Sequence, residues 1–125
     1  MLKHSNAMAT IAVKDVEAAR QFYEGQLGLD TVASEPGMLI LRSGDSTVMV
    51  YESAFAGTNK ANAATWSVTG NIDELVRILG ARGVPFLHYD DMPNTTRHGD
   101  VHVSGDRKVA WCHDPDGNIL CLAHG

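Results

Sequence analysis

The feature that most constrains the fold of this 125-residue chain is a weak internal repeat. In the first copy, residues 7–13 form a strand-like stretch, followed by a helical pattern that ends at Gly28. In the second copy, residues 62–68 and Gly83 occupy the same places, 55 positions further on. A repeat of this length indicates two copies of one supersecondary unit that bury their apolar faces together. The chain is therefore expected to fold as two similar modules.

Towards the end of each copy the offset changes. Residues 41–50 correspond to residues 112–121, which are 71 positions apart. The second copy is therefore 16 residues longer, the difference between the two offsets. The extra residues fall between its second and third strands, in residues 90–107, which are rich in turn-forming side chains. We predict a long loop there.

Local signals define the ends of one helix in each copy. Asp15 is placed to cap the first helix, and Gly28 is placed to end it in a left-handed conformation. Asn71 and Glu74 form a capping box for the second helix, and Gly83 ends it.

Each copy is predicted to run strand, helix, strand, strand, strand. The hairpins turn at residues 43–46 and 114–118. The boundaries are a first module at about 7–53, a linker at 54–62 and a second module at about 63–123, all within one domain spanning 1–125. The fold class is α+β, with two βαβββ modules. Each helix covers one face of its own sheet, which leaves the other face free to curve into a cup around a cavity.

Composition excludes several kinds of partner. Fifteen acidic against ten basic side chains give a net charge of −5, which argues against nucleic acid as a partner. No apolar run approaches the roughly 18 residues that a membrane span needs, and residues 1–5 are too polar for a signal peptide. Two cysteines, Cys112 and Cys121, make no disulfide framework, so a cytoplasmic location is expected.

Several short motifs resemble those of a known superfamily. They are residues 13–16, Phe22-Tyr23, residues 27–29 and the run Ala110-Trp111-Cys112-His113-Asp114-Pro115-Asp116-Gly117-Asn118. Their order and spacing are similar to the vicinal oxygen chelate superfamily, which includes glyoxalase I, bleomycin-resistance proteins, fosfomycin-resistance enzymes and extradiol dioxygenases. The resemblance covers residues 7–123 and implies cupped sheets, often in a homodimer.

The resemblance also implies where a metal would be held. Metal enzymes of the superfamily use a His or Gln early in the first strand of a module and a Glu in its last strand. Carried across by register, these positions hold Met8, Val50, Ala63 (or Ala64) and Cys121. A divalent metal that acts as a Lewis acid needs imidazole, carboxylate or water ligands. The usual metal site is therefore expected to be absent, with no cofactor, and metal-dependent catalysis is disfavoured.

Strand alternation predicts which side chains line the cup. If both hairpins pair symmetrically about their turns, Val50 lies opposite Ile40, and Cys121 lies opposite Trp111. The predicted lining of the cavity is Met8, Thr10, Ile40, Arg42, Val50, Thr65, Ser67, Trp111, His113 and Cys121. The same alternation predicts that another set of side chains faces the helices: Ile11, Leu39, Leu41, Met49, Tyr51, Trp66, Ala110, Cys112, Leu120 and Leu122.

For four of the predicted cavity residues, two alternative roles are open. Trp111 either stacks on a planar ligand or packs on the sheet. Arg42 either holds an anionic group or forms a surface ion pair. His113 is either an acid/base group or a solvated residue at a strand end. Cys121 is either a reactive thiolate or a small buried apolar residue.

An apolar hollow with a few polar groups is typical of a small-molecule pocket. The sequence therefore predicts a metal-free binding protein for a drug-like or metabolite ligand, as in bleomycin resistance. The alternative is a glyoxalase-like lyase or dioxygenase with displaced ligands, drawn from His88, His98, His102 and His113. A third reading is a structural or regulatory dimer whose cavity is filled by its own side chains. The catalytic residues, if any, are not identified by the sequence.

Overall fold

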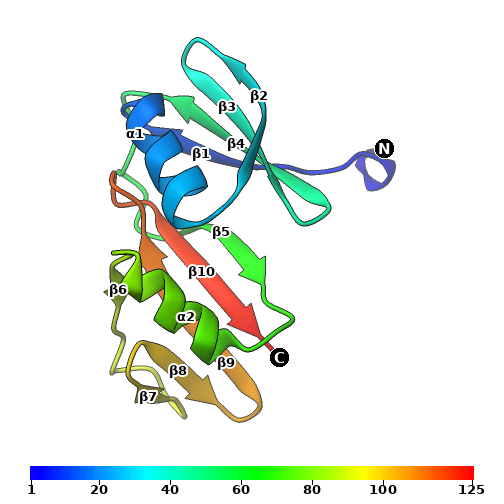
Figure 1. Ribbon diagram of the computed structural model, residues 1–125. Coiled ribbons are helices and arrows are strands. Elements are labelled where there is room, and N and C mark those ends of the chain that lie inside the picture. Colours follow the sequence, from blue (N-terminus) through cyan, green and yellow to red (C-terminus); the bar gives the residue numbers. More distant parts are fainter.

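A computed structural model describes all residues, 1–125, and contains two β-sheets with one helix packed on each (Figure 1). The first sheet has the order β1-β4-β3-β2, with β1 parallel to β4 and the other pairs antiparallel. Its elements are β1 (Ala9–Val13), α1 (Val16–Arg20) with a π-helical continuation (Gln21–Gln26), β2 (Asp30–Glu35), β3 (Met38–Ser43) and β4 (Ser46–Glu52).

The second sheet repeats this plan and extends it. Its main path is β5-β10-β9-β8-β7, with β5 parallel to β10 and with β6 paired to β9. Its elements are β5 (Asn62–Ser67), α2 (Ile72–Ala81), β6 (Phe86–Leu87), β7 (Thr96–His98), β8 (Val101–Ser104), β9 (Arg107–His113) and β10 (Ile119–His124).

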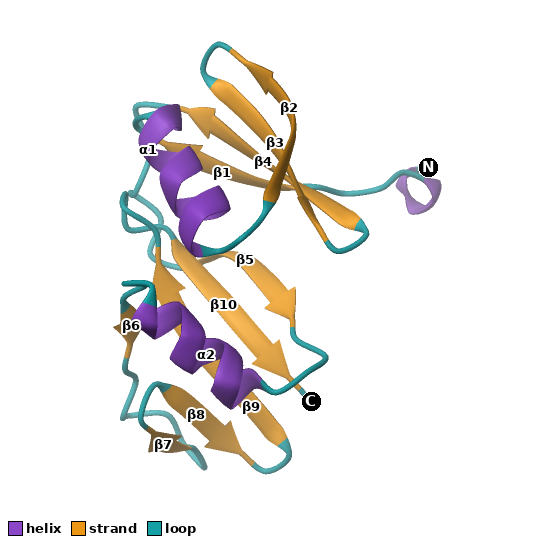
Figure 2. Cartoon of the chain, in the orientation of Figure 1, coloured by secondary structure: helices purple, strands orange, loops and turns teal.

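Both helices cover the same side of the molecule, and the strands lie behind them (Figure 2). Between the helices and the sheets lies one continuous apolar core, to which both modules contribute. Leu41 of β3, Tyr23 of the first helix and Leu120 of β10 are completely buried in it. Burying apolar area against both sheets is the main force that holds the two modules together.

The predicted helix ends are confirmed. The side chain of Asp15 accepts a hydrogen bond from the backbone of Glu17, and that of Asn71 accepts one from the backbone of Glu74. Gly28 and Gly83 follow the helices with φ angles of +79° and +87°. These left-handed conformations favour glycine, because other residues pay a steric penalty there.

The long loop predicted at residues 90–107 is only partly a loop. Its second half forms the β7–β8 hairpin, which widens the second sheet beyond β9. Val101 is buried on the helix side and Val103 is partly buried there, while His102 between them faces the opposite side. This alternation is a strand pattern, but it spans too few residues to stand out beside the turn formers that precede it.

The register of the second hairpin is as predicted, and that of the first differs by one residue. Cys121 pairs with Trp111. In the first hairpin, Ser43 pairs with Ser46 across a two-residue turn, so Ile40 lies opposite Met49 and Leu39 lies opposite Val50. The symmetric pairing of Ile40 with Val50 is therefore wrong, because the tighter turn removes one residue from the connection.

Because of this one-residue difference, each side chain of β4 lies on the side of the sheet opposite to the one predicted. Val48 and Val50 pack in the core, with exposures of 5% and 0%. Met49 and Tyr51, which were predicted to face the helices, point to the opposite side. Tyr51 is 38% exposed there.

A buried carboxylate ties the C-terminal hairpin to the first module. Asp114, 1% exposed, accepts a hydrogen bond of 2.8 Å from the hydroxyl of Tyr23. It also accepts from the side-chain amide of Asn118 and from the backbone of Asp116 and Asn118. The amide of Asn118 in turn donates to the carbonyl of Ala12 in β1. Every oxygen of the buried charge is thus satisfied by a donor, as a stable interior requires.

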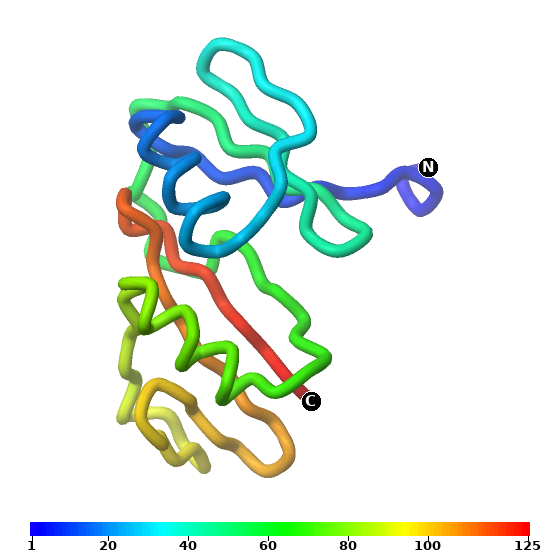
Figure 3. The backbone as a smooth tube through the Cα atoms, viewed as in Figure 1, coloured from blue at the N-terminus to red at the C-terminus, as the bar shows by residue number.

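The chain ends lie at different places on the molecule. Residues before β1 project away from the body as an arm that begins with a 3-10 helix (Leu2–His4) (Figure 3), while the C-terminus follows β10 of the second sheet. Neither α-helix has the length and apolar character needed to cross a membrane.

We predict that Tyr23→Phe lowers the free energy of unfolding by about 1–3 kcal/mol, because the buried carboxylate of Asp114 loses one donor. Urea denaturation followed by circular dichroism measures the change. Tyr51→Phe, which deletes the hydroxyl of an exposed tyrosine, is the matched control and should change stability by less than about 0.5 kcal/mol. Equal effects of the two substitutions would contradict the role assigned to Asp114.

Candidate functional site

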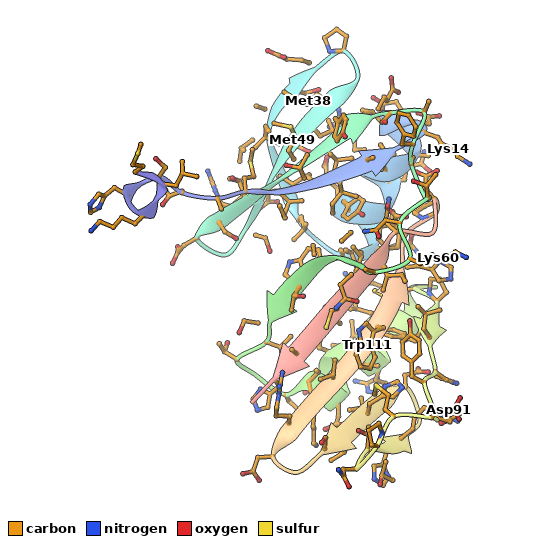
Figure 4. All side chains as sticks on the ribbon, turned by 180° about the vertical axis from the view of Figure 1, so that it is seen from behind. Lys14, Met38, Met49, Lys60, Asp91 and Trp111 are labelled. Carbon is orange, nitrogen blue, oxygen red and sulfur yellow. The ribbon has the colours of Figure 1, made fainter.

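The sheet face turned away from the helices, here called the open face, is the predicted site of ligand binding. Strands of both modules form it, and β1 of the first module contacts β5 of the second. Seen from this side, Met38 and Met49 lie on the first sheet and Trp111 lies on the second (Figure 4). No segment of the chain covers the first sheet on this side, where Met38 and Met49 are half-buried and Tyr51 is exposed.

The corrected register of β4 changes one of the four strand positions at which the resemblance places metal ligands. In the second module Thr65 pairs with Cys121, and in the first module Thr10 pairs with Met49. Met49, and not the buried Val50, is therefore the counterpart of Cys121. The four positions hold Met8, Met49, Ala63 and Cys121.

These four side chains do not fit a divalent metal. Two are thioethers, one is a methyl group and one is a thiol, whereas Mg²⁺, Mn²⁺, Zn²⁺ and Fe²⁺ in Lewis-acid sites take imidazole and carboxylate ligands. The sulfur of Met8 is already in contact with the hydroxyl of Thr47, at 3.2 Å. Nowhere in the chain do three or more His, Cys, Asp or Glu side chains come together as a metal site would need.

The cysteine at the open face is buried and poorly suited to act as a nucleophile. Cys121 is 6% exposed, and burial raises the pKa of its thiol although a hydrogen bond with Thr65 lowers it. Cys112 faces the helices, where burial raises its pKa to about 12. Both cysteines are free. Since the thiolate is the reactive form, Cys121 behaves as a small apolar residue of the open face.

Two of the predicted cavity residues line a hollow at the junction of the two sheets. Thr65 and Ser67 of β5 border a space of about 460 Å³ together with Thr47 of β4. Trp66 lies at the same place, and its indole nitrogen donates to the hydroxyl of Ser43 at 2.8 Å. That hydrogen bond connects the first hairpin to β5 across the junction of the modules.

The other predicted residues are spread over the open face and its edges. Met8, Thr10 and Arg42 are exposed, and Ile40 is half-buried. His113 is half-buried at the end of β9, where it borders a small hollow of about 200 Å³ with Pro85. Its Nδ1 lies 3.2 Å from the carbonyl oxygen of Asp114.

Trp111 sits in an aromatic cluster that the sequence did not indicate. Tyr89 meets it edge to face, with ring centroids 5.0 Å apart, and His102 does so at 4.8 Å. Both partners come from the segment between β6 and β9. The alternation of His102 with Val101 and Val103 is the one sequence signal that could have placed it beside Trp111.

The histidines proposed as displaced metal ligands do not come together. His88 is bonded to Asp100 at 2.7 Å, and His98 is exposed on β7. His102 uses one ring nitrogen as acceptor from the backbone of Tyr89, and the other lies near the carbonyl of Val109. His113 lies at the far end of β9.

A second hollow lies on the helix side, outside the predicted site. It has a volume of about 410 Å³ and lies between the end of the first helix, at Leu27 and Leu29, and the α2 residues Leu75 and Leu79. Trp66 and Ser67 border both this hollow and the one at the junction of the sheets.

Comparison with known proteins identifies the family. The family model of the Glyoxalase/Bleomycin resistance protein/Dioxygenase superfamily matches residues 5–122, and the chain belongs to this superfamily. The α+β fold predicted from the repeat is confirmed by this match and by the solved structures that resemble it. No curated protein matches the sequence.

Three solved structures illustrate the range of relatives that share the fold. An integron cassette protein, HFX_CASS4, from the mobile metagenome of Halifax Harbour Sewage Outfall is 19% identical, with a TM-score of 0.71 and coverage of 97% of this chain and 99% of that one. The fosfomycin resistance protein FosX from Listeria monocytogenes is 14% identical, with a TM-score of 0.72 and coverage of 97% and 93%. A lactoylglutathione lyase from Agrobacterium tumefaciens is 19% identical, with a TM-score of 0.69 and coverage of 97% and 94%. At these identities the likeness concerns the fold alone.

We predict that the two neighbouring substitutions Val50→Glu and Met49→Glu have very different effects on stability. Val50→Glu places a carboxylate in the core and should cost more than about 3 kcal/mol, which lowers the melting temperature by about ten degrees or more. Met49→Glu places the same group on the open face and should leave a cooperative thermal transition within a few degrees of the wild type. The reverse order of the two melting temperatures would show that the register of β4 is wrong.

Proposed function

We propose that this protein binds a small organic molecule on its open face without a metal ion. The observation that carries the proposal is the set of side chains at the four metal positions, which are Met8, Met49, Ala63 and Cys121. They replace hard donors by apolar and sulfur-containing groups while the two-module fold is retained. An apolar face with a few hydroxyl groups suits a ligand recognised by shape and stacking.

The polar groups available to orient such a ligand are few. Thr65 and Ser67 offer hydroxyls at the junction of the sheets, and Arg42 offers a positive charge on β3. Trp111 provides a ring for stacking, with Tyr89 at its edge. The net charge of −5 favours the approach of a cationic ligand over an anionic one.

A homodimer in the cytoplasm is part of the same proposal. The uncovered apolar face supports a second copy that closes over it, and the two free cysteines agree with a reducing compartment. Size-exclusion chromatography with light scattering, at micromolar protein concentration, measures the mass directly.

The direct test is a thermal-shift titration with planar cationic aromatic molecules, proflavine and ethidium among them, and with Zn²⁺, Ni²⁺, Mn²⁺ and Fe²⁺. A ligand at one hundred times its Kd stabilises the folded state by about 2.7 kcal/mol. At least one organic probe should raise the Tm, and the metals should leave it unchanged. Trp111→Ala should weaken the organic probe at least tenfold.

The matched control is Phe55→Ala, which removes an exposed aromatic ring from the linker between β4 and β5 and should leave the affinity for the organic probe unchanged. Metal content measured by mass spectrometry on untagged protein completes the test. Stoichiometric metal together with a rise in Tm on metal addition would overturn the proposal.

A further inference from the structure

A buried histidine holds the segment that lies against the Trp111 side of the open face. This segment, residues 88–95 between β6 and β7, is here called the strap. Beneath it, His102 of β8 is only 1% exposed, although its ring faces away from the helices. This completely buried imidazole has no part in the proposed binding site, so its contacts indicate another role.

Both nitrogens of the His102 ring are engaged. Nε2 accepts a hydrogen bond of 2.9 Å from the backbone N–H of Tyr89 in the strap. Nδ1 lies 3.3 Å from the carbonyl oxygen of Val109 in β9, which can only accept. The arrangement therefore requires a neutral ring with its proton on Nδ1.

The ring of Tyr89 depends on this bond for its position. Its backbone is anchored on His102, and its side chain packs edge-on against Trp111 with the ring planes at 87°. His102 meets the same tryptophan at 81°. The strap, the histidine and Trp111 thus form one packed unit on the second sheet.

Charged groups around His102 come from the strap, β7 and the β7–β8 turn. Nε of Arg97 in β7 donates a hydrogen bond of 2.7 Å to Oδ1 of Asp90 in the strap. Nε2 of His88 in the strap is hydrogen-bonded to Oδ1 of Asp100, also at 2.7 Å. Arg97 and His88 oppose a positive charge on His102, while Asp90 favours one. From β9 the ring meets only the carbonyl of Val109 and the ring of Trp111.

We infer that His102 is an acid-sensitive latch: protonation of its Nε2 releases the strap and frees the ring of Trp111 from its contact with Tyr89. A protonated Nε2 carries a hydrogen that points at the N–H of Tyr89, so two donors face each other and the bond is lost. A charged ring at this depth also lacks solvation and has no carboxylate bonded to it. Opening of the strap gives the ring access to water and removes both costs.

The direction of the pH dependence follows from the burial of the ring. Desolvation lowers the pKa of His102 in the closed state, although the Val109 carbonyl raises it. The open state has an ordinary histidine, with a pKa of about 6.5. Protons therefore bind preferentially to the open state, so the strap is closed above about pH 6.5 and opens progressively as the pH falls below it. That opening admits a ligand to Trp111 rests on the proposed function, whereas the latch itself does not.

Hydrogen–deuterium exchange of the strap in the ligand-free protein tests the latch. After correction for the intrinsic pH dependence of exchange, protection of the peptide that contains Tyr89 should fall between pH 7.5 and 5.5, by up to about tenfold for one proton and an open-state pKa of about 6.5. Peptides from the first sheet should keep their protection. Equal protection of the strap at both pH values would overturn the inference.

Two substitutions assign the effect to one ring. His102→Gln keeps an acceptor for the N–H of Tyr89 but does not titrate, so strap protection should become independent of pH. His88→Gln removes the histidine of the strap itself and should leave the pH dependence intact. If His102→Gln does not fold, NMR titration of the wild-type ring decides: a pKa at or above 6.5 would contradict the latch. A loss of pH dependence in His88→Gln would also overturn it.

Discussion

The carboxylate of Asp114 is the contact on which the arrangement of the two modules depends. It lies in the turn between the last two strands, yet it is bonded to Tyr23 of the first helix, and its partner Asn118 reaches the carbonyl of Ala12 in β1. Burial, with the negative charge of Asp114 beside it, raises the pKa of Tyr23, so the hydroxyl stays a donor at any ordinary pH. One hairpin turn thereby fixes the first module against the second through directional bonds, which the non-directional packing of the core cannot do.

The hydrogen bonds of Asp114 and Asn118 between the modules also determine which strands lie side by side on the open face. With both helices on one side, the edge strands β1 and β5 of the two sheets contact each other at the junction of the modules. The positions at which relatives with metals place hard donors then fall on the four strands around that junction. In this chain they carry sulfur and methyl groups, which is why we propose that the open face binds its ligand without a metal. The segment between β6 and β9 adds the half-exposed ring of Tyr89 beside Trp111, with the buried ring of His102 beneath it.

The sequence predicted the fold well because its strongest signals are local and repeated. Helix caps at Asp15 and Asn71 and the turn at residues 114–118 are each decided by a few neighbouring residues. Which residues of β4 face the core was harder to predict, because both faces of this strand are apolar. Val48 and Val50 on one face and Met49 and Tyr51 on the other are equally acceptable in a core, so only the length of the turn decides between them.

The candidate site was predicted less completely, for a different physical reason. Trp111, Thr65 and Cys121 were placed on the correct face by strand alternation. Tyr89 and His102 were not, because their position depends on how an irregular insertion folds back over β8 and β9. Long-range contacts of this kind are set by tertiary packing and leave only a three-residue alternation in the sequence.

The most direct test of the central claim, that the open face retains the geometry of a metal site but not its donors, is to restore the donors. A variant with Met8→His, Met49→Glu, Ala63→His and Cys121→Glu should bind Ni²⁺ or Zn²⁺ at one ion per chain in isothermal titration calorimetry, while the wild type should show no binding heat. Failure of a folded variant to bind either ion would contradict the account. So would stronger binding by the variant that carries Val50→Glu in place of Met49→Glu.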